Sequence, residues 1–310
     1  DNAGWINASD DIRVNYSNYK EVERVQTTGA FLTVSHDFGL LELTSISAFW
    51  KAERFVSLDV DKSPFNSLHI TRHPNSDQYS QELRLASSDP SAFRWVAGAL
   101  FFKQPLEVEN FFSFSGTADP RDAGIPQNYH NDARTKAVFA ETITDLNSTF
   151  SLTVGARYSI DENAFGMTFP LVGIDDITRE REDKNVSGRV ILNQSIGEDF
   201  SLYYSISTGF QGGGYNGGAF GLADIGDGYK PEKLTAYEIG WKSEPLGRRM
   251  KVNGALFFYD YEDIQLFSLA ATSTGDFSQT IANTRKGRAY GLDLDVKALV
   301  TEHLTIAGGV

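Results

Sequence analysis

The sequence predicts an all-β protein: a transmembrane, antiparallel, up-and-down β-barrel to which this chain would contribute about 12 strands. Three observations lead to this fold class. Long segments alternate apolar and polar residues, and many of them exceed the usual strand length of a soluble sheet. The connections between them alternate short turns with long polar loops.

The composition excludes several classes of protein. The 310 residues carry a formal net charge of −13 and include no cysteine. The acidity argues against nucleic-acid partners, which need a positive surface, and the lack of cysteine excludes thiol catalysis, disulfides and cysteine-ligated metals. The longest apolar run, 95–102, is too short for a transmembrane helix. Residues 1–5 lack the basic and apolar parts of a signal peptide, so none is expected.

The alternation of residue types is clearest between Thr149 and Asp161. Apolar side chains occupy one face of this segment and polar side chains the other, with the period of two that a β-strand imposes. The same pattern recurs at 200–210, 237–242 and 290–298. Each segment therefore suits a wall that has lipid on one side and water on the other.

The length of these segments points to a membrane. Many run for about 10–14 residues, against about 5–6 in an ordinary strand. Twelve residues at about 3.3 Å each reach roughly 40 Å, and a tilt of about 45° leaves a vertical span near 28 Å. That span is close to the thickness of the hydrocarbon core of a bilayer.

Tight turns and long loops alternate along the chain. Turns are expected near 37–39, 88–91, 147–148, 197–198, 245–248 and 301–302. Polar loops are expected near 56–76, 104–132, 163–183, 211–231 and 263–284. In an up-and-down sheet the turns all fall at one end and the loops at the other, which is typical of short periplasmic turns and long extracellular loops.

Aromatic residues gather near the expected strand ends, where an interfacial girdle would place them. Any single ring could equally belong to an ordinary β-sheet core, so the inference depends on the repeated position. The clustered rings are Phe49, Trp50, Phe55, Phe101, Phe102, Phe210, Tyr215, Phe257, Phe258 and Tyr259.

Five segments together resemble the TonB-dependent outer-membrane receptors. The resemblance runs from about Gln78 to the end of the chain, and more loosely from Arg24. Each segment lies on an expected strand, in the order and at the hairpin spacing of that family. The segments are 79–87 (YSQELRLAS), 205–216 (SISTGFQGGGYN), 229–242 (YKPEKLTAYEIGWK), 255–261 (ALFFYDY) and 287–295 (GRAYGLDLD).

This resemblance implies a barrel of about 22 strands, closed inside by an N-terminal plug domain. It implies a receptor in the bacterial outer membrane, not an enzyme, that imports a scarce bulky ligand with energy supplied by TonB. The ligand would be a ferric siderophore, a cobalamin-like compound or an oligosaccharide. The implied partners are the TonB complex, the lipid bilayer with its lipopolysaccharide, and this small-molecule or glycan ligand; no cofactor is implied. The chain shows no plug, TonB box or final aromatic strand, so residues 1–310 are expected to form part of a barrel.

The candidate ligand-contacting residues lie in two expected loops at the mouth of the barrel. Gln211, Tyr215 and Asn216 belong to a glycine-rich stretch and could supply stacking and hydrogen bonds, and Tyr229 lies near the end of the same loop. The alternative interpretation of this stretch is a flexible loop leaving a strand. A phosphate cradle is not expected, because neither the Lys-Ser/Thr pair nor the following helix of a P-loop is present.

His69 and His73 have the spacing that binds zinc when both lie on a helix. They are expected instead in a polar surface loop before Pro74, where they could touch a substrate, and no metal site is assigned. Acidic pairs elsewhere lack the spacing of a calcium loop and are expected to be solvated. No nucleophile elbow is present, and whether two carboxylates have the separation of a glycosidase is not visible in a sequence.

Three other functions remain open. A passive porin would be complete at roughly 16–18 strands and would need no plug. An adhesion barrel would use its loops to bind partners. A soluble β-rich binding module or glycosidase would fold without detergent.

Overall fold

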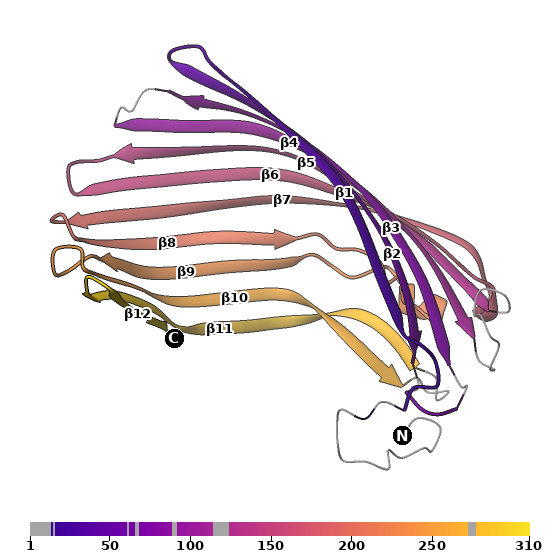
Figure 1. Ribbon diagram of the computed structural model, residues 1–310. Coiled ribbons are helices and arrows are strands. Elements are labelled where there is room, and N and C mark those ends of the chain that lie inside the picture. The colour runs from indigo at the N-terminus through magenta and orange to yellow at the C-terminus, as the bar shows by residue number, and fades with distance from the viewer. Residues whose placement is uncertain are drawn as a thin grey trace.

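The computed structural model describes residues 14, 16–60, 62–65, 68–88, 92–113, 124–271 and 277–310. They form one antiparallel sheet of 12 strands, in which each strand pairs with its neighbours in the sequence. The sheet curls into an open trough with β1 and β12 at its edges (Figure 1). The all-β, up-and-down fold and the strand number predicted from the sequence are confirmed.

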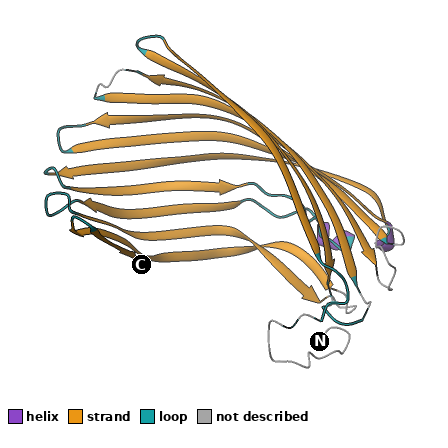
Figure 2. Cartoon of the chain, viewed as in Figure 1, coloured by secondary structure: helices purple, strands orange, loops and turns teal. Residues whose placement is uncertain are grey.

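The strands are long and joined in hairpins (Figure 2). Two short helices lie among the described residues, η1 at Pro170–Val172 and α2 at Leu222–Ile225. No helix in the described ranges is both long and apolar enough to cross a bilayer. The strands are β1 Val22–Asp37, β2 Leu41–Asp59, β3 His69–Ser87, β4 Phe93–Ser113, β5 Ile125–Asp145, β6 Phe150–Phe169, β7 Ile174–Ile196, β8 Phe200–Gln211, β9 Glu232–Ser243, β10 Met250–Ala271, β11 Phe277–Thr301 and β12 Leu304–Gly309.

The expected tight turns all fall between consecutive strands at one end of the sheet, which we call the turn end. Within the expected turn 88–91, residues 89–91 lie outside the described residues. Among the described residues the expected loops are largely wrong, because only 211–231 is mainly loop; residues 61, 66–67, 114–123 and 272–276 of the other expected loops lie outside the described residues. For example, β6 ends at Phe169 and β7 begins at Ile174, so most of 163–183 is strand.

The polar ends of the strands look like loops in the sequence for a physical reason. Beyond the lipid, a strand no longer needs one apolar face, so the alternation fades although the ladder of hydrogen bonds continues. The β6–β7 hairpin pairs almost without interruption up to its tip. Twenty residues at about 3.3 Å each and a tilt of about 45° rise roughly 47 Å, well above an apolar band of about 25 Å.

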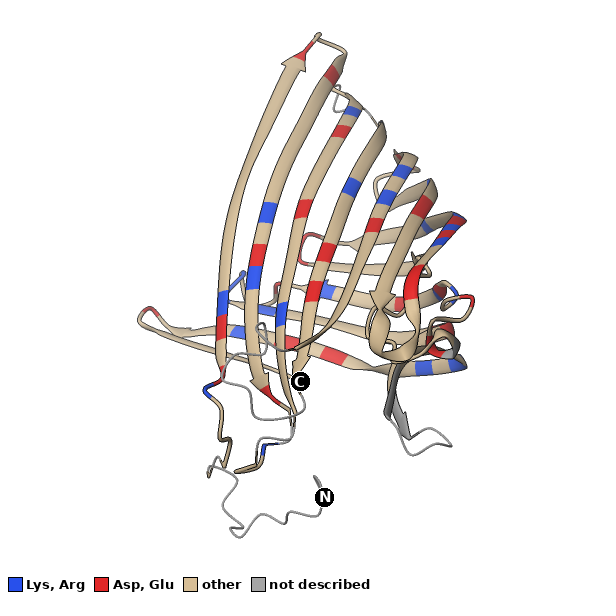
Figure 3. Cartoon of the chain, turned by 90° about the vertical axis from the view of Figure 1, so that its right-hand side faces the viewer, with Lys and Arg blue, Asp and Glu red and all other residues tan. Residues whose placement is uncertain are grey.

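The two faces of the sheet differ as the alternation predicts. On β6, Val154 and Tyr158 are 42% and 40% exposed, whereas Thr153 and Ser159 on the opposite face are 7% and 6% exposed. We call the face of Val154 the outer face and the face of Thr153 the inner face. Charged positions of both signs are spread over the strands (Figure 3), so neither sign dominates the sheet.

Some rings of the expected aromatic girdle lie on the outer face, as a girdle requires. Phe49 lies directly opposite Tyr79, with ring centroids 5.1 Å apart, and Tyr237, Phe258 and Tyr290 are cross-strand partners in one row. The girdle prediction is wrong for four residues that face inward: Trp50, Phe102, Phe257 and Tyr259. Each follows or precedes an outward-facing residue, and consecutive residues of a strand point to opposite faces. Tyr215 belongs to the buried cluster described next.

A compact apolar cluster lies at the loop end of the sheet, on the inner face of the extended hairpins. Its buried members are Phe112, Phe165, Met167, Phe169, Ile174, Tyr215, Ala219 and Ile225. They come from β4, β6, β7 and the connection between β8 and β9, which are far apart in the sequence. The cluster therefore holds that connection against the inner wall.

Candidate functional site

The connection between β8 and β9 is the candidate site, and it contains or adjoins four of the six predicted residues. We call residues 212–231 the mouth loop. Tyr215 stacks on Phe165 of the wall with ring centroids 5.5 Å apart, and Phe220 meets Phe112 edge-on at 5.4 Å. The mouth loop is thus packed over the inner wall.

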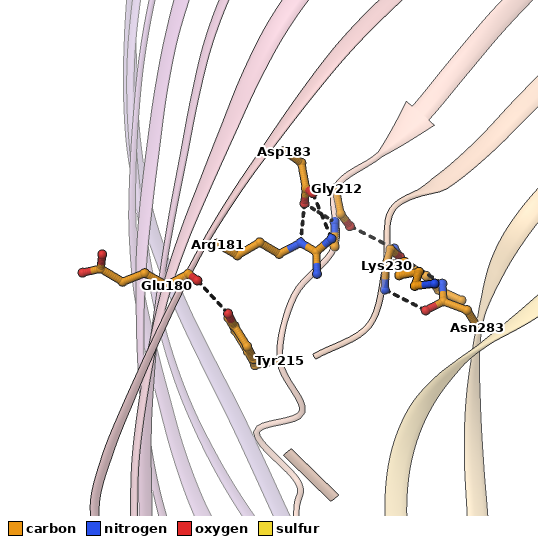
Figure 4. A network of polar contacts seen from close by, with 9 residues as sticks. Glu180, Arg181, Asp183, Gly212, Tyr215, Lys230 and Asn283 are labelled. Atoms are coloured by element: carbon orange, nitrogen blue, oxygen red, sulfur yellow. Dashed lines mark hydrogen bonds and ion pairs between the residues drawn. The ribbon is translucent and has the colours of Figure 1, made fainter. Parts of the chain in front are cut away.

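A first polar anchor ties the beginning of the mouth loop to β7 (Figure 4). The Arg181 guanidinium donates two hydrogen bonds to the Asp183 carboxylate, at 2.5 and 2.9 Å. The same carboxylate accepts a hydrogen bond from the backbone N–H of Gly213 at 3.0 Å. The Tyr215 hydroxyl donates to the carbonyl oxygen of Glu180 at 2.9 Å.

A second anchor ties both ends of the mouth loop to β10 and β11. The Gln265 side-chain amide donates to the carbonyl oxygens of Gly212 at 2.9 Å and Lys230 at 3.0 Å. Asn283 accepts from the Lys230 N–H at 2.7 Å and donates to the Lys230 carbonyl at 2.9 Å. The predicted Gln211 adds a side-chain hydrogen bond to Gln265 at 3.1 Å.

The glycines of this stretch permit close packing. A Cβ on Gly217 would come within 2.5 Å of the Tyr129 ring, and a Cβ on Gly213 would come within 2.5 Å of the Arg181 guanidinium. Gly214 also pairs with the predicted Tyr229 through backbone hydrogen bonds of 3.1 and 2.8 Å. The stretch is a loop that leaves the end of β8, as the alternative interpretation has it, and its glycines pack closely against the wall.

Burial and hydrogen bonds shift the pKa values of side chains in and beside the mouth loop. Loss of hydration raises the pKa values of the Tyr215 and Tyr229 hydroxyls, so both phenols are neutral at physiological pH. The hydrogen bonds to Asp183 raise the pKa of Arg181, which stays charged. The first anchor is therefore a charge-assisted contact, which is stronger than one between neutral groups.

A buried polar ladder supports the mouth loop from below, and sequence reasoning missed it. Asn110 donates to the side-chain oxygen of Gln127 at 2.9 Å, and Gln127 donates to the carbonyl oxygen of Ala219 at 2.8 Å. Asn110 and Gln127 are 0% and 1% exposed. The available signal was the placement of polar residues on the inward face of two strands.

The predicted Asn216 is buried in the mouth loop, where its side-chain oxygen accepts the N–H of Gly218 at 3.2 Å. In this conformation Tyr215 and Asn216 are packing residues, whereas Gln211 is exposed and Tyr229 is half-buried. Their role as ligand contacts stays a prediction.

The two histidines lie apart from the mouth loop. Both belong to β3, so their expected placement in a loop is wrong, and the register puts them on the outer face. His69 is buried beneath Tyr19, with ring centroids 4.2 Å apart, and its Nε2 lies 3.3 Å from the Asn18 side-chain oxygen. His73 meets Phe55 edge-on at 4.9 Å. The structure therefore does not bring them together with the other predicted residues.

A second feature of the inner face is a hollow of about 420 Å³ farther down the wall. It is lined by Glu82, Arg84, Phe139 and Arg157, together with the ion pair between Arg189 and Glu141 at 2.5 Å. In the described ranges, no group of three or more His, Asp or Glu residues could hold a metal ion. The charged side chains that line this hollow can make polar contacts with a ligand.

Comparison with known proteins gives one consistent answer. Residues 1–309 match the model of the family described as TonB dependent receptor-like, beta-barrel. Pesticin receptors of Yersinia enterocolitica and Yersinia pestis are 24% identical over 239 residues, which is 76% of this chain and 33% of each receptor. The chain therefore spans about a third of the length of these curated relatives.

Solved structures show the same fold. The ferric yersiniabactin uptake receptor of Yersinia pestis has a TM-score of 0.76 at 20% identity, covering 94% of this chain and 43% of that receptor. The siderophore receptor PiuA of Acinetobacter baumannii has a TM-score of 0.72 at 14% identity, covering 95% of this chain and 47% of PiuA. With almost the whole sequence matched by the family model, this chain belongs to the β-barrel family of the TonB-dependent receptors.

Proposed function

We propose that this chain forms part of the barrel of an outer-membrane receptor that imports a scarce ligand with energy from TonB. The observation that carries the proposal is the family match over residues 1–309. The outer face supports it, because its aromatic rows and exposed aliphatic residues suit lipid. The proposal includes a closed barrel of which residues 1–310 are one part, a plug domain, and location in the Gram-negative outer membrane.

The proposed ligand is a ferric siderophore. Structural neighbours include proteins described as receptors for ferric yersiniabactin, alcaligin and pyoverdine, and as a ferric citrate transporter. A cobalamin-like compound or an oligosaccharide is the alternative ligand. The proposed contacts are the exposed Gln211 and the half-buried Tyr229, with Tyr215 and Asn216 becoming available if the mouth loop leaves the wall.

The comparisons give no support to a passive porin, since the neighbours named here are uptake receptors. We also propose that the protein is not an enzyme, because the family to which the chain belongs is one of transport receptors. The partners we propose are the TonB complex, through the plug, and the phosphorylated glycolipids of the outer leaflet. One structural neighbour was solved in complex with a pyocin, and we propose no such partner for this chain.

An uptake assay tests the function. The full-length gene is expressed in an outer-membrane host that lacks its own iron receptors, and cells are given radiolabelled ferric siderophores, cyanocobalamin or labelled oligosaccharides. We expect uptake of a ferric siderophore that stops when a proton uncoupler is added. Uptake that continues with the uncoupler would indicate a passive pore, and energised uptake of only one of the other ligands would replace the proposed ligand class.

A further inference from the structure

The wall of the barrel splits between β7 and β8. β7 pairs with β6 over almost its whole length, but it pairs with β8 only from Arg189 to Ile196. Beyond this point β8 stays paired with β9 as far as Gln211 and leaves the side of β7, which continues alone toward the loop end (Figure 1). Residues 177–188 of β7 therefore have a neighbouring strand on one side only.

Thr208 marks the point where the two strands separate. Its hydroxyl accepts a hydrogen bond from the backbone N–H of Gly188 at 2.9 Å and lies 3.4 Å from the Gly188 carbonyl oxygen, to which it donates. In a continued ladder the backbone of Thr208 would make these contacts. The side chain thus takes the place of the next backbone pair and lets β8 leave β7.

β7 presents an open backbone edge along this split. Gly188 points its backbone groups to the edge, and so does Glu180, whose carbonyl oxygen accepts a hydroxyl of the mouth loop at 2.9 Å. Every second residue of a strand points to the same edge, so the backbone groups of Glu182, Lys184 and Val186 face it too. Over the described part of the chain, none of these three forms a backbone hydrogen bond across the edge.

The chain beyond Thr208 follows the register of the β7–β8 ladder although it lies out of its plane. The continued register places Gly213 opposite Asp183, and the Gly213 N–H indeed donates to the Asp183 carboxylate at 3.0 Å. A Cβ on Gly212 would lie 3.7 Å from the Cβ of Asp161, on the inner face of β6. The end of β8 therefore lies over the inner face instead of beside β7.

This displacement separates two apolar side chains. The continued register places Phe210 opposite Val186, and alternation from the outward Ile206 predicts that Phe210 faces outward as well. Phe210, a further expected member of the girdle, instead lines an inner hollow of about 350 Å³. Val186 is 71% exposed, since no β8 side chain covers it. Both side chains would gain an apolar contact if the ladder continued.

We infer that the wall has a second state, in which residues 208–214 join the open edge of β7 and continue the ladder. Phe210 then returns to the outer face against Val186, and Gly212 crosses from the inner face into the plane of the sheet. Because the mouth loop follows directly, the change draws Tyr215 away from Phe165 and uncovers the aromatic part of the inner wall. The switch supplies the movement that ligand contacts by the mouth loop require, and its role in uptake rests on the proposed function.

The test lets one thiol choose between two partners on opposite faces of the sheet. The full-length receptor carries D161C/K184C/G212C, with any cysteine outside residues 1–310 replaced by serine. The Cβ separation of 3.7 Å at positions 161 and 212 suits a disulfide in the present structure. Position 184 lies on the outer face, opposite position 212 in the continued register, so a 184–212 disulfide reports the second state. The receptor is equilibrated in detergent with a glutathione redox buffer, and mass spectrometry counts both disulfides.

T208V is the variant that should shift the balance, because it removes the hydroxyl that holds Gly188 in the split state. T235V is the matched control: Thr235 is the cross-strand partner of Thr208 on β9, and no hydrogen bond of its hydroxyl occurs among the described residues. We expect T208V to raise the ratio of the 184–212 to the 161–212 disulfide by about 3-fold to 10-fold, the effect of one neutral hydrogen bond. The ratio in T235V should change by less than about twofold.

The register has its own control, in which E180C replaces K184C. Glu180 is on the same face of β7 but four residues away, so no 180–212 disulfide should form. Three results would overturn the second state: no 184–212 disulfide in any variant, equal amounts of the 180–212 and 184–212 disulfides, or equal ratios in T208V and T235V. A 184–212 disulfide found only in receptor that has lost its folded band in unheated gel electrophoresis would overturn it too.

The uptake assay with radiolabelled ferric siderophores tests the role of the switch in transport. Oxidised D161C/G212C holds the mouth loop on the wall, so we expect uptake at least about tenfold slower than in the same variant after reduction. Equal uptake before and after reduction would overturn that role. The disulfide ratio is measured without a ligand, so absent uptake in the unchanged receptor refutes the proposed function alone.

Discussion

Removal of the Asp183 carboxylate should release the mouth loop from the wall. Asp183→Ala deletes two hydrogen bonds from Arg181 and one from the Gly213 N–H. The Arg181 side chain, 18% exposed, loses its counter-charge. Hydrogen bonds to a charged group are worth about 1.5–3 kcal/mol each and do not add fully, so we expect the loop to lose about 2–4 kcal/mol of local stability.

Hydrogen–deuterium exchange measures this loss directly. The N–H groups of Gly214 and Tyr229 are bonded across the neck of the mouth loop, at 3.1 and 2.8 Å, and should report its opening. A loss of 2–4 kcal/mol corresponds to exchange that is roughly 30-fold to 1,000-fold faster. Amides in the middle of β6 should not change.

Glu182→Ala is the matched control, because Glu182 is the next residue on β7 but pairs with Lys184 on the outer face. An exposed pair of this kind contributes about 0–1 kcal/mol. If Asp183→Ala and Glu182→Ala gave the same exchange at Gly214 and Tyr229, the carboxylate would not be the anchor of the loop. Acceleration confined to β7 would lead to the same conclusion.

Three further outcomes are expected. Gly217→Ala places a methyl group within 2.5 Å of the Tyr129 ring and should cost about 1–3 kcal/mol by overpacking, seen as faster proteolysis of the mouth loop; unchanged cleavage would contradict the packing. Val154→Arg should lower unfolding stability in lipid vesicles by about 2–4 kcal/mol, far more than Val154→Ala, and equal losses would contradict a lipid-facing position. Arg94→Gln should raise the pKa of Asp145, which the Arg94 hydrogen bonds now hold below its usual value; carboxyl NMR measures this pKa, and an unmoved value would exclude the pairing. Because the pKa of Asp145 is lowered in the folded protein, the stabilisation that Arg94 gives at neutral pH should be lost as acid protonates Asp145, which unfolding measured against pH would show.

The sequence allowed the fold to be predicted because lipid imposes a strict rule. Along 149–161 each second residue must be apolar to face lipid, and that rule is visible in the letters alone. The turns near 37–39 and 197–198 were predictable for a related reason, since Gly39 and Gly197 have positive φ values that suit glycine.

The candidate site was harder to predict because its contacts join distant segments. Tyr215 was recognisable as an aromatic residue in a glycine-rich loop, but its burial against Phe165 depends on hairpins that extend beyond the lipid. The histidines were misplaced for the same reason, since a polar strand looks like a loop when neither face has to be apolar.

The cluster beneath the mouth loop and the lipid-facing band are stabilised in different ways. In the lipid-facing band, the hydrocarbon around Val154 and Tyr158 stabilises the outer face, so that region depends on the detergent or bilayer that surrounds it. At the loop end, Phe165, Phe169 and Tyr215 are buried against one another and away from water, as in the core of a small soluble protein. Urea or moderate heating should therefore loosen the mouth loop while the band stays folded, and a harsh detergent should act on the band first.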